Sequence, residues 1–490
     1  MGAGELILVA SSKDKYYLTK NPEITFFKIY YKRHTNFSIE TIPQEFINKL
    51  DFGKQATLII GRNGDLVSRV YLHIDLPVLN SNISRRPKYK IRYVDNLGYA
   101  LINKIELEIG GTIISREYGE WMYIWKELTT GKDKKRGMDE MLGNNEKYNK
   151  FESSKISLSL DIPLIFWFCK SIGDALPLIS LMKDEVKLHI DIRRLEEVLI
   201  QSPQKFITMN ENFSLFKEYE VIKQNANGVE SAGEFVEYDI LNKRLYYNPL
   251  YGNFDIPVTD NNFMLVGENG YKMSIKKGSQ SPRDVIDFFN LNYPPIIDSY
   301  CLVDYIFLDS KERELYVKRN HEYLIPITQN ITEETVVSSN VRVNLPLVFP
   351  ISGIFWRVIL NDNIVRKEYF NYSMSPYTKE ENSIIKNVKI LINGQPLTNI
   401  EQEEYYRLIQ RHNYYNGMGN SNLYNYSFSL YPLDSQPYGS LNFSNIDDAS
   451  IQLTLDGLIE YRVPARIKVY GLSYNIFRII NQSGKLVFRT

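Results

Sequence analysis

The sequence has few of the residues from which metal sites, thiol chemistry and disulfide scaffolds are built. Its 490 residues include two cysteines, Cys169 and Cys301, and five histidines. Two cysteines are too few to form a disulfide scaffold in a chain of this length, so we expect both to be buried free thiols in a reducing compartment. No histidine lies at metal-ligand spacing from another His or Cys, so no zinc site is predicted.

The sequence also lacks net charge, because its 58 Lys and Arg residues equal its 58 Asp and Glu residues in number. Proteins that bind nucleic acid through phosphate contacts carry an excess of basic charge, which drives binding by counterion release. We therefore expect no direct, specific binding of nucleic acid.

Long uninterrupted hydrophobic runs are missing as well. The most apolar stretch, residues 162–182, is broken by Lys170, Gly173, Asp174 and Pro177. This pattern predicts two buried strands with a loop between them, and it excludes a membrane-spanning helix here. The N-terminus has no basic leader followed by a long apolar core, so no signal peptide is predicted.

Catalytic and cofactor motifs are absent too. The sequence contains no G-x-S-x-G, no Walker A motif and no local Cys–His signature. The acidic pairs Glu403-Glu404 and Asp447-Asp448 are interpreted as solvated carboxylates. A glycosidase pair stays open, because its two carboxylates need not be close in sequence. We identify no catalytic, cofactor-binding or metal-binding residue, and we expect a protein that is not an enzyme.

The clearest feature that is present is a pair of similar hairpin patterns. In residues 101–117 apolar and polar side chains alternate up to a turn at Gly110-Gly111. Residues 385–399 repeat the alternation up to a turn at Asn393-Gly394, and Asn103 aligns with Lys386 at an offset of 283 residues. Two β-rich runs separated by such a dipeptide predict a tight hairpin, because the turn needs positive φ angles.

A second pair of similar segments follows in the same order. Residues 175–191 resemble residues 439–456 at an offset of 265. The matched apolar positions are Val186 with Ile451, Leu188 with Leu453, and Ile190 with Leu455. Two ordered matches with similar offsets indicate that a whole β domain is duplicated, because small-repeat proteins have much shorter periods.

The remaining pattern favours an all-β fold. The 36 Tyr and 24 Phe residues suit strands, and many short strands with Gly and Pro turns are typical of sandwiches. We predict two tandem eight-stranded antiparallel jelly rolls with long loops and few short helices. The predicted division is a 1–25 N-terminal arm, a 26–210 first jelly roll, a 211–295 linker or insertion of surface loops, and a 296–490 second jelly roll.

Several segments allow more than one interpretation. Residues 26–40 are basic and aromatic, which suits either an amphipathic edge strand or a phosphate or interface contact. The charge run at 131–137 predicts a solvated loop tip, and Asn63-Gly64 predicts a hairpin corner.

Residues 196–295 are either a linker with an insertion or a small subdomain. The second strand set is expected to begin at 298–309, and residues 345–360 to form two buried strands.

Five stretches resemble the major capsid proteins of nucleocytoplasmic large DNA viruses. They lie in both halves of the chain and in the family's order, namely residues 17–37, 162–192, 304–314, 321–325 and 426–455. The resemblance implies a double jelly roll whose homotrimer forms a pseudo-hexagonal capsomer that tiles an icosahedral shell around an internal membrane. It agrees with the duplication, since two similar barrels in each of three chains give six similar edges.

The resemblance also implies partners and a location. The partners would be further copies of the chain, neighbouring capsomers, minor capsid proteins and possible inner-membrane proteins of the virus. The location would be the capsid of the virion, after synthesis in the host cytoplasm. A minor capsid paralogue stays open, as does a two-domain β-sandwich that binds or hydrolyses glycans. Residues 1–25 are expected to contact neighbouring subunits, with packing on their own barrel as the alternative.

Overall fold

The structure is a computed structural model. It describes residues 3, 5–6, 19–29, 31–80, 89–226, 228–257, 263–279, 282–285, 294–374, 382–417, 422–457, 459 and 463–488. Its contacts divide the chain into a short unit, Met1–Phe37, and a large unit, Ser38–Thr490.

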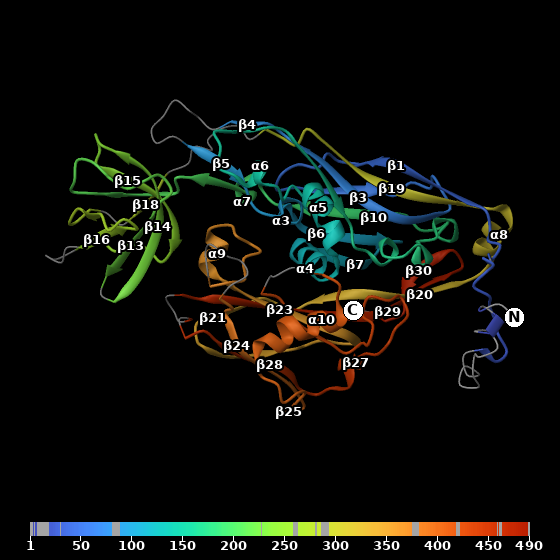
Figure 1. The fold of residues 1–490 in the computed structure, drawn as a ribbon. Coiled ribbons are helices and arrows are strands. Elements are labelled where there is room, and N and C mark those ends of the chain that lie inside the picture. Colours follow the sequence, from blue (N-terminus) through green and yellow to red (C-terminus); the bar gives the residue numbers. More distant parts are fainter. Residues whose placement is uncertain are drawn as a thin grey trace. The chain divides into compact units, whose positions relative to one another are not determined.

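The first jelly roll consists of two four-stranded antiparallel sheets in the large unit (Figure 1). One sheet has the order β1-β19-β3-β9 and the other has the order β2-β10-β6-β7. The strands are β1 (Phe37–Glu45), β2 (Gln55–Ile59), β3 (Leu66–Leu76), β6 (Ile102–Ile109), β7 (Thr112–Tyr118), β9 (Leu158–Pro163), β10 (Val186–Ile192) and β19 (Asp298–Leu308).

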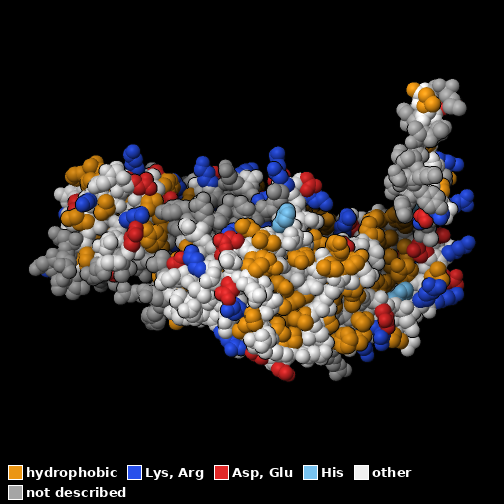
Figure 2. All heavy atoms as spheres, turned by 60° about the horizontal axis from the view of Figure 1, so that its bottom comes forward, with side chains coloured by type: hydrophobic (Ala, Val, Ile, Leu, Met, Phe, Trp, Pro, Cys, Tyr) orange, Lys and Arg blue, Asp and Glu red, His pale blue; other side chains and the backbone are white. Residues whose placement is uncertain are grey.

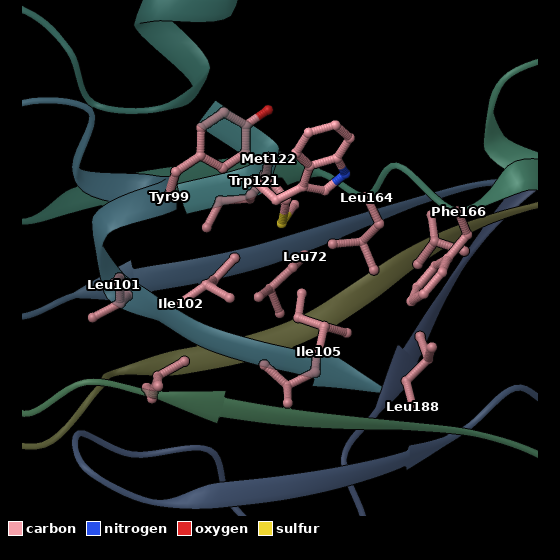
Figure 3. Close-up of a cluster of buried hydrophobic side chains, with 14 of the residues drawn as sticks. Leu72, Tyr99, Leu101, Ile102, Ile105, Trp121, Met122, Leu164, Phe166 and Leu188 are labelled. Carbon is pink, nitrogen blue, oxygen red and sulfur yellow. The ribbon is translucent and has the colours of Figure 1, made fainter. Parts of the chain in front are cut away.

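Alternation along these strands explains how the two sheets close on one core. In β10, Val186, Leu188 and Ile190 are buried, whereas the residues between them are partly exposed. Figure 3 shows Leu188 of β10 and Ile105 of the neighbouring strand β6 pointing into the same interior as Leu72 of β3, and all three are buried. Each such side chain contributes about 1.5–3 kcal/mol when it is fully removed from water, so the strand pattern itself specifies which face lies inward.

The second jelly roll repeats this arrangement. Its sheets have the orders β20-β29-β23-β26 and β22-β28-β24-β25. The strands are β20 (His321–Asn330), β22 (Asn340–Asn344), β23 (Pro350–Leu360), β24 (Ile385–Ile392), β25 (Gln395–Pro396), β26 (Tyr424–Ser427), β28 (Ala449–Leu455) and β29 (Ala465–Ile480). The short strands β21 (Glu334–Val336), β27 (Leu441–Asn442) and β30 (Ser483–Leu486) pair at the margins of the first of these sheets.

The predicted duplication is confirmed by the pairing. The hairpin β6–β7 lies beside β10, and the hairpin β24–β25 lies in the same way beside β28. The alignment of β10 with β28 drawn from sequence is wrong by two residues. Ile109 of the first hairpin pairs with Val186, and the equivalent Ile392 of the second pairs with Ala449, so Val186 corresponds to Ala449 and not to Ile451. A shift of two residues keeps every side chain on the same face, so the apolar pattern alone does not detect it.

The boundary before the second jelly roll is corrected by β19. This strand was expected to begin the second strand set, but it pairs with β3 over nearly its whole length and completes the first jelly roll. The position of β19 in the first roll corresponds to that of β29 in the second, since each lies beside the central strand of its sheet. A strand's own sequence does not say which sheet it joins, because its register is set by partners distant in the chain.

Much of the predicted linker forms a folded module. A seven-stranded sheet with the order β17-β16-β13-β14-β15-β12-β18 spans residues 205–284 and has its own apolar core. Its strands are β12 (Lys205–Thr208), β13 (Val221–Ala226), β14 (Val229–Asp239), β15 (Arg244–Tyr251), β16 (Met264–Gly267), β17 (Lys272–Ser274) and β18 (Arg283–Asp284). We refer to this module, inserted between β10 and β19, as the insertion sheet.

Helices and short strands fill the connections. The helices are α3 (Leu97–Leu101), α4 (Gly119–Thr129), α5 (Lys132–Met141), α6 (Glu146–Asn149), α7 (Leu195–Val198), α8 (Ser310–Lys318), α9 (Asn361–Val365) and α10 (Gln410–Tyr414). Short pairs β4 (Leu79–Asn80) with β8 (Ser154–Lys155), and β5 (Lys90–Tyr93) with β11 (Leu199–Ser202), join the connections.

Several local predictions were wrong. The stretch 164–182 contains 3₁₀ turns in place of a second strand, and residues 345–360 contain one strand, β23. Asn63-Gly64 lies in a crossing from β2 to β3, which belong to different sheets, so it is not a hairpin corner. The charge run at 131–137 is exposed as expected, but its residues from Lys132 onward are helical in α5.

The long connections of the first jelly roll leave from one end. Asp75, near the end of β3, pairs with Ser159 at the start of β9 and with Asp298 at the start of β19. In the other sheet, Ile192 at the end of β10 pairs with Ile102 at the start of β6. The connection carrying α3, the connection carrying α4–α6 and the insertion sheet therefore all emerge at the same end.

Candidate functional site

The two jelly rolls meet across α4, whose aromatic residues lie between them. The Trp121 ring packs edge-on against Phe355 of β23, with centroids 5.1 Å apart, and lies 5.3 Å from Tyr470 of β29. Tyr123 stacks on Phe370 at 4.1 Å. Residues of both rolls thus belong to one continuous hydrophobic core, which fixes one roll against the other.

A buried ion cluster lies at this interface. The Arg357 guanidinium of β23 donates to Glu120 of α4 at 2.5 Å and to Glu333 at 2.5 Å. The Glu120 carboxylate also accepts from the Tyr470 hydroxyl at 2.7 Å and lies 3.3 Å from the Lys468 ammonium. Burial alone would raise the pKa of Glu120, but Arg357 and Lys468 hold it at about 2. We call these residues the Glu120 cluster.

A second pair of opposite charges, the buried Glu117 and the exposed Lys170, has weaker partners. Glu117 accepts hydrogen bonds from Ser115 at 3.3 Å and from Thr328 of the second roll at 3.5 Å. The Lys170 ammonium lies 4.4 Å from the centroid of Trp125. Burial raises the pKa of Glu117 to about 8.

The two rolls lie side by side with the same ends together. At one end, Ser435 in the β26–β28 connection donates to Asp174 in the β9–β10 connection at 2.7 Å. At the other end, Tyr369 after α9 donates to the carbonyl of Glu197 in α7 at 2.8 Å. Because connections from the same end of each roll meet at both ends, the rolls are arranged in parallel, and Figure 1 shows them as two stacked layers.

Apolar side chains gather on the surface at the end that carries Ser435 and Asp174. Ile172, Leu430, Tyr431 and Tyr438 are between 41% and 66% exposed, and the two tyrosine rings pack edge-on at 5.1 Å. Figure 2, which brings the second jelly roll forward, shows hydrophobic side chains gathered on its face. Exposed apolar patches of this kind are typical of association surfaces.

The edge strand β1 is a second candidate for association. Its residues are mostly exposed, including Ile39 at 46%, although Thr41 donates to Asp304 of β19 at 2.6 Å. Among the described residues, this nine-residue strand is paired on one side, with β19. An open edge presents backbone donors and acceptors that another chain can use.

The N-terminal unit has an unusual composition for an exposed segment. Its described residues up to 36 contain no strand, so the edge strand that was one interpretation of 26–40 is present only from Phe37 onward, in β1. Phe26, Phe27, Ile29 and Tyr31 are between 85% and 97% exposed. Residues 7, 8 and 16–18, on which the arm prediction also rested, lie outside the described residues. An exposed aromatic segment of this kind suits contact with another molecule.

Comparisons with known proteins agree with this architecture. A family described as "Major capsid protein N-terminus" matches residues 25–239, and one described as "Large eukaryotic DNA virus major capsid protein" matches residues 312–484. Probable capsid protein 4 of Acanthamoeba polyphaga mimivirus is 32% identical over the whole of both chains. The chain belongs to the major capsid protein family of large DNA viruses.

Other relatives extend this assignment and confirm the double jelly roll. The major capsid protein of Phaeocystis pouchetii virus is 28% identical over the whole of both chains. The PBCV-1 virus capsid subunit has a TM-score of 0.65 at 23% identity, with 95% of this chain and 100% of that chain covered. The Faustovirus major capsid protein has a TM-score of 0.67 at 12% identity, with coverages of 96% and 94%.

Two of the four acidic residues singled out by sequence take part in ion pairs, and the interpretation of Glu403 as a solvated carboxylate was wrong because its side chain is buried. Glu403 is 6% exposed and pairs with Arg407 at 2.8 Å, one helical turn away. Asp448 pairs with Arg342 at 2.7 Å across neighbouring strands. Both pairs join local elements of the second roll, so the capsid fold accounts for them.

The two cysteines are free thiols that differ in burial. Cys301 is buried and Cys169 is partly exposed, and both are free. Within the described part of the chain, no three His, Cys, Asp or Glu residues are grouped so that they could hold a metal ion. In the same residues, no helix is both long and apolar enough to cross a membrane.

Sequence reasoning missed the Glu120 cluster, although one signal was available. Arg357 is the only charged residue in the apolar run 350–360, and a lone arginine in a buried strand requires a carboxylate partner. Its partner, Glu120, lies 237 residues away in the sequence. The pattern could indicate that a partner exists, but not which of the 58 acidic residues it is.

Proposed function

We propose that this chain is the structural subunit of a virus shell and assembles as a homotrimer into a pseudo-hexagonal capsomer. The observation that carries the proposal is the parallel, side-by-side packing of two equivalent jelly rolls. Three such chains around a threefold axis present six similar barrels, and that arrangement lets neighbouring capsomers pack in a near-hexagonal lattice. The names of the full-length relatives support the same role.

The open edge of β1 supports association of the chain with itself. A nine-residue strand that is mostly exposed and paired on one side is an association hazard for a monomer. Enclosing it in a permanent interface, which typically buries more than about 2,000 Å² in total, would remove the hazard. Neighbouring capsomers, minor capsid proteins and inner-membrane proteins would then contact other faces.

The ends of the jelly rolls suggest which side faces outward. The insertion sheet and α5 leave from the end that carries the long connections, where extra structure does not disturb the packing of the barrels. We place this end on the outer face of the capsomer. The opposite end, with Ile172 and Leu430, would then face the interior, where minor capsid proteins lie.

The oligomeric state tests the proposal directly. Light scattering of the purified full-length chain at micromolar concentration should give three times the chain mass of 57.3 kDa. A monomer under these conditions would contradict the proposal. Limited proteolysis of assembled particles should cut first in the insertion sheet or near residues 131–137, and cuts confined to other regions would contradict the outward placement.

The N-terminal arm is proposed to contact neighbouring subunits or minor capsid proteins in the shell. Deleting residues 2–22 should leave folded trimers with near-normal melting but should impair shell assembly, because it removes apolar side chains of the arm, such as the exposed Leu6, that are proposed to contact neighbours. Calorimetry of the trimer and electron microscopy of assembly reactions measure the two effects. Unfolding of the first jelly roll on deletion would instead show that the arm is part of its core.

A further inference from the structure

A cavity between the two jelly rolls carries an excess of positive charge. It has a volume of about 240 Å³ and receives residues from both rolls. Its charged lining consists of four cations and two carboxylates, namely Arg193, Arg357, Arg466, Lys468, Glu120 and Glu333. Two positive charges therefore remain after each carboxylate is balanced by one cation.

The carboxylates are already engaged by the cations around them. Glu120 is bound by Arg357 and approached by Lys468, as described above. Glu333 accepts from Arg357 at 2.5 Å and lies 3.3 Å from Arg466. The two excess positive charges are therefore shared among the four cations. Burying positive charge costs free energy unless an anion lies close to it.

The cations retain hydrogen-bond donors. The Arg466 Nε group is buried and has no hydrogen-bond partner among the described residues, although the guanidinium also donates to Asn361 at 2.9 Å. Lys468 carries three donors and lies 3.3 Å from Glu120. Arginine forks and lysine point charges together are the usual means of holding tetrahedral oxyanions.

The cavity is open to solutes from the side of Arg466. The side chains of Arg466 and Glu333 are 36% and 29% exposed, whereas that of Arg357 is 5% exposed. The charged side chains are therefore most exposed at Arg466 and Glu333 and most buried at Arg357. An anion entering here would be desolvated progressively, which strengthens its attraction to the cations.

We propose that this cavity binds one small dianion of the phosphate class, which contacts cations of both jelly rolls. Arg193 follows β10 of the first roll, and Arg466 and Lys468 lie in β29 of the second. A dianion neutralises the two excess charges and adds a bridge between the rolls. Because the ligand binds the folded chain and not the unfolded one, it stabilises the fold in proportion to its concentration.

Inorganic phosphate is the probe that tests this inference. Isothermal titration of the full-length protein at pH 7.5 should show one phosphate per chain. The thermal midpoint should rise with phosphate relative to sodium chloride at equal ionic strength. The variant Arg466→Gln should weaken phosphate binding at least tenfold and remove this rise.

The matched control is Arg478→Gln on the same strand. Arg478 also pairs with a glutamate, Glu322, at 2.6 Å, and its side chain is 40% exposed, but it does not line the cavity. This variant should bind phosphate as the unchanged protein does. If Arg466→Gln itself misfolds, Lys468→Gln gives the same test by titration.

Two results would overturn the inference. One is the absence of heat above dilution when phosphate is titrated into the unchanged protein. The other is a phosphate-dependent rise in the thermal midpoint that is equal in Arg466→Gln and Arg478→Gln, which would assign the effect to general salt exclusion. Neither result bears on the trimer, which light scattering tests separately.

Discussion

Glu117 and Glu120 lie on the same segment between the jelly rolls, yet their pKa values shift in opposite directions. Glu120 lies within 3.3 Å of two cations, and its pKa falls to about 2. Glu117 accepts hydrogen bonds from the neutral hydroxyls of Ser115 and Thr328, and its pKa rises to about 8. A direct cationic partner therefore decides whether a buried carboxylate stays charged, since desolvation acts on both.

The comparison also separates two roles in the interface. The Glu120 cluster joins α4 to β23 and β29 through charge-assisted hydrogen bonds. These bonds are directional, so they fix the position of one roll against the other. Glu117 contributes only weak hydrogen bonds to the positioning of the rolls, but its raised pKa makes the stability of the interface depend on pH. The three predictions below test this contrast, and protomer concentration is held constant throughout.

Breaking the Glu120 cluster should have the largest effect. Arg357→Met keeps a long apolar side chain but leaves Glu120 and Glu333 without their main partner. Removing one member of a buried ion pair typically costs about 3–5 kcal/mol, and urea unfolding should show a loss of that size. A loss below about 1 kcal/mol would mean that Lys468 and water replace the guanidinium.

Neutralising Glu117 should have an intermediate effect that depends on pH. The raised pKa means that the folded chain keeps a proton that the unfolded chain loses above its ordinary value of 4.5. Stability contributed by this group should therefore fall as pH rises from about 4.5 to about 8.

The variant Glu117→Gln removes this titration and should be more stable than the unchanged protein at pH 8, by roughly 1–3 kcal/mol. At pH 5 the two proteins should have similar free energies of unfolding. Parallel pH profiles for Glu117→Gln and the unchanged protein would contradict the assignment.

An exposed ion pair of the second roll should show the smallest effect. Arg342 and Asp448 lie 2.7 Å apart, but both side chains are 49% exposed. Solvent screens such a pair, so Arg342→Met should lower the free energy of unfolding by less than about 1 kcal/mol. A loss as large as that of Arg357→Met would mean that burial does not distinguish the two sites.

The sequence predicted the local elements best where the chain itself carries the signal. The turns at Gly110-Gly111 and Asn393-Gly394 require positive φ angles, and each forms the expected hairpin. Alternation in β10 and β28 correctly indicated their buried faces. Predictions failed where aromatic runs such as 164–168 were taken as strands, because apolar content indicates burial and not backbone conformation.

The sequence by itself determined the duplication, the all-β class and the faces of the main strands, because alternation and turn chemistry act between residues close in the chain. The tertiary structure alone decided that β19 completes the first roll, that the two rolls lie parallel, and that Glu120 meets Arg357. These outcomes depend on partners more than 170 residues apart. No local pattern encodes such a pairing, since it is selected by the packing of whole sheets and by the cost of leaving a buried charge without its counterion.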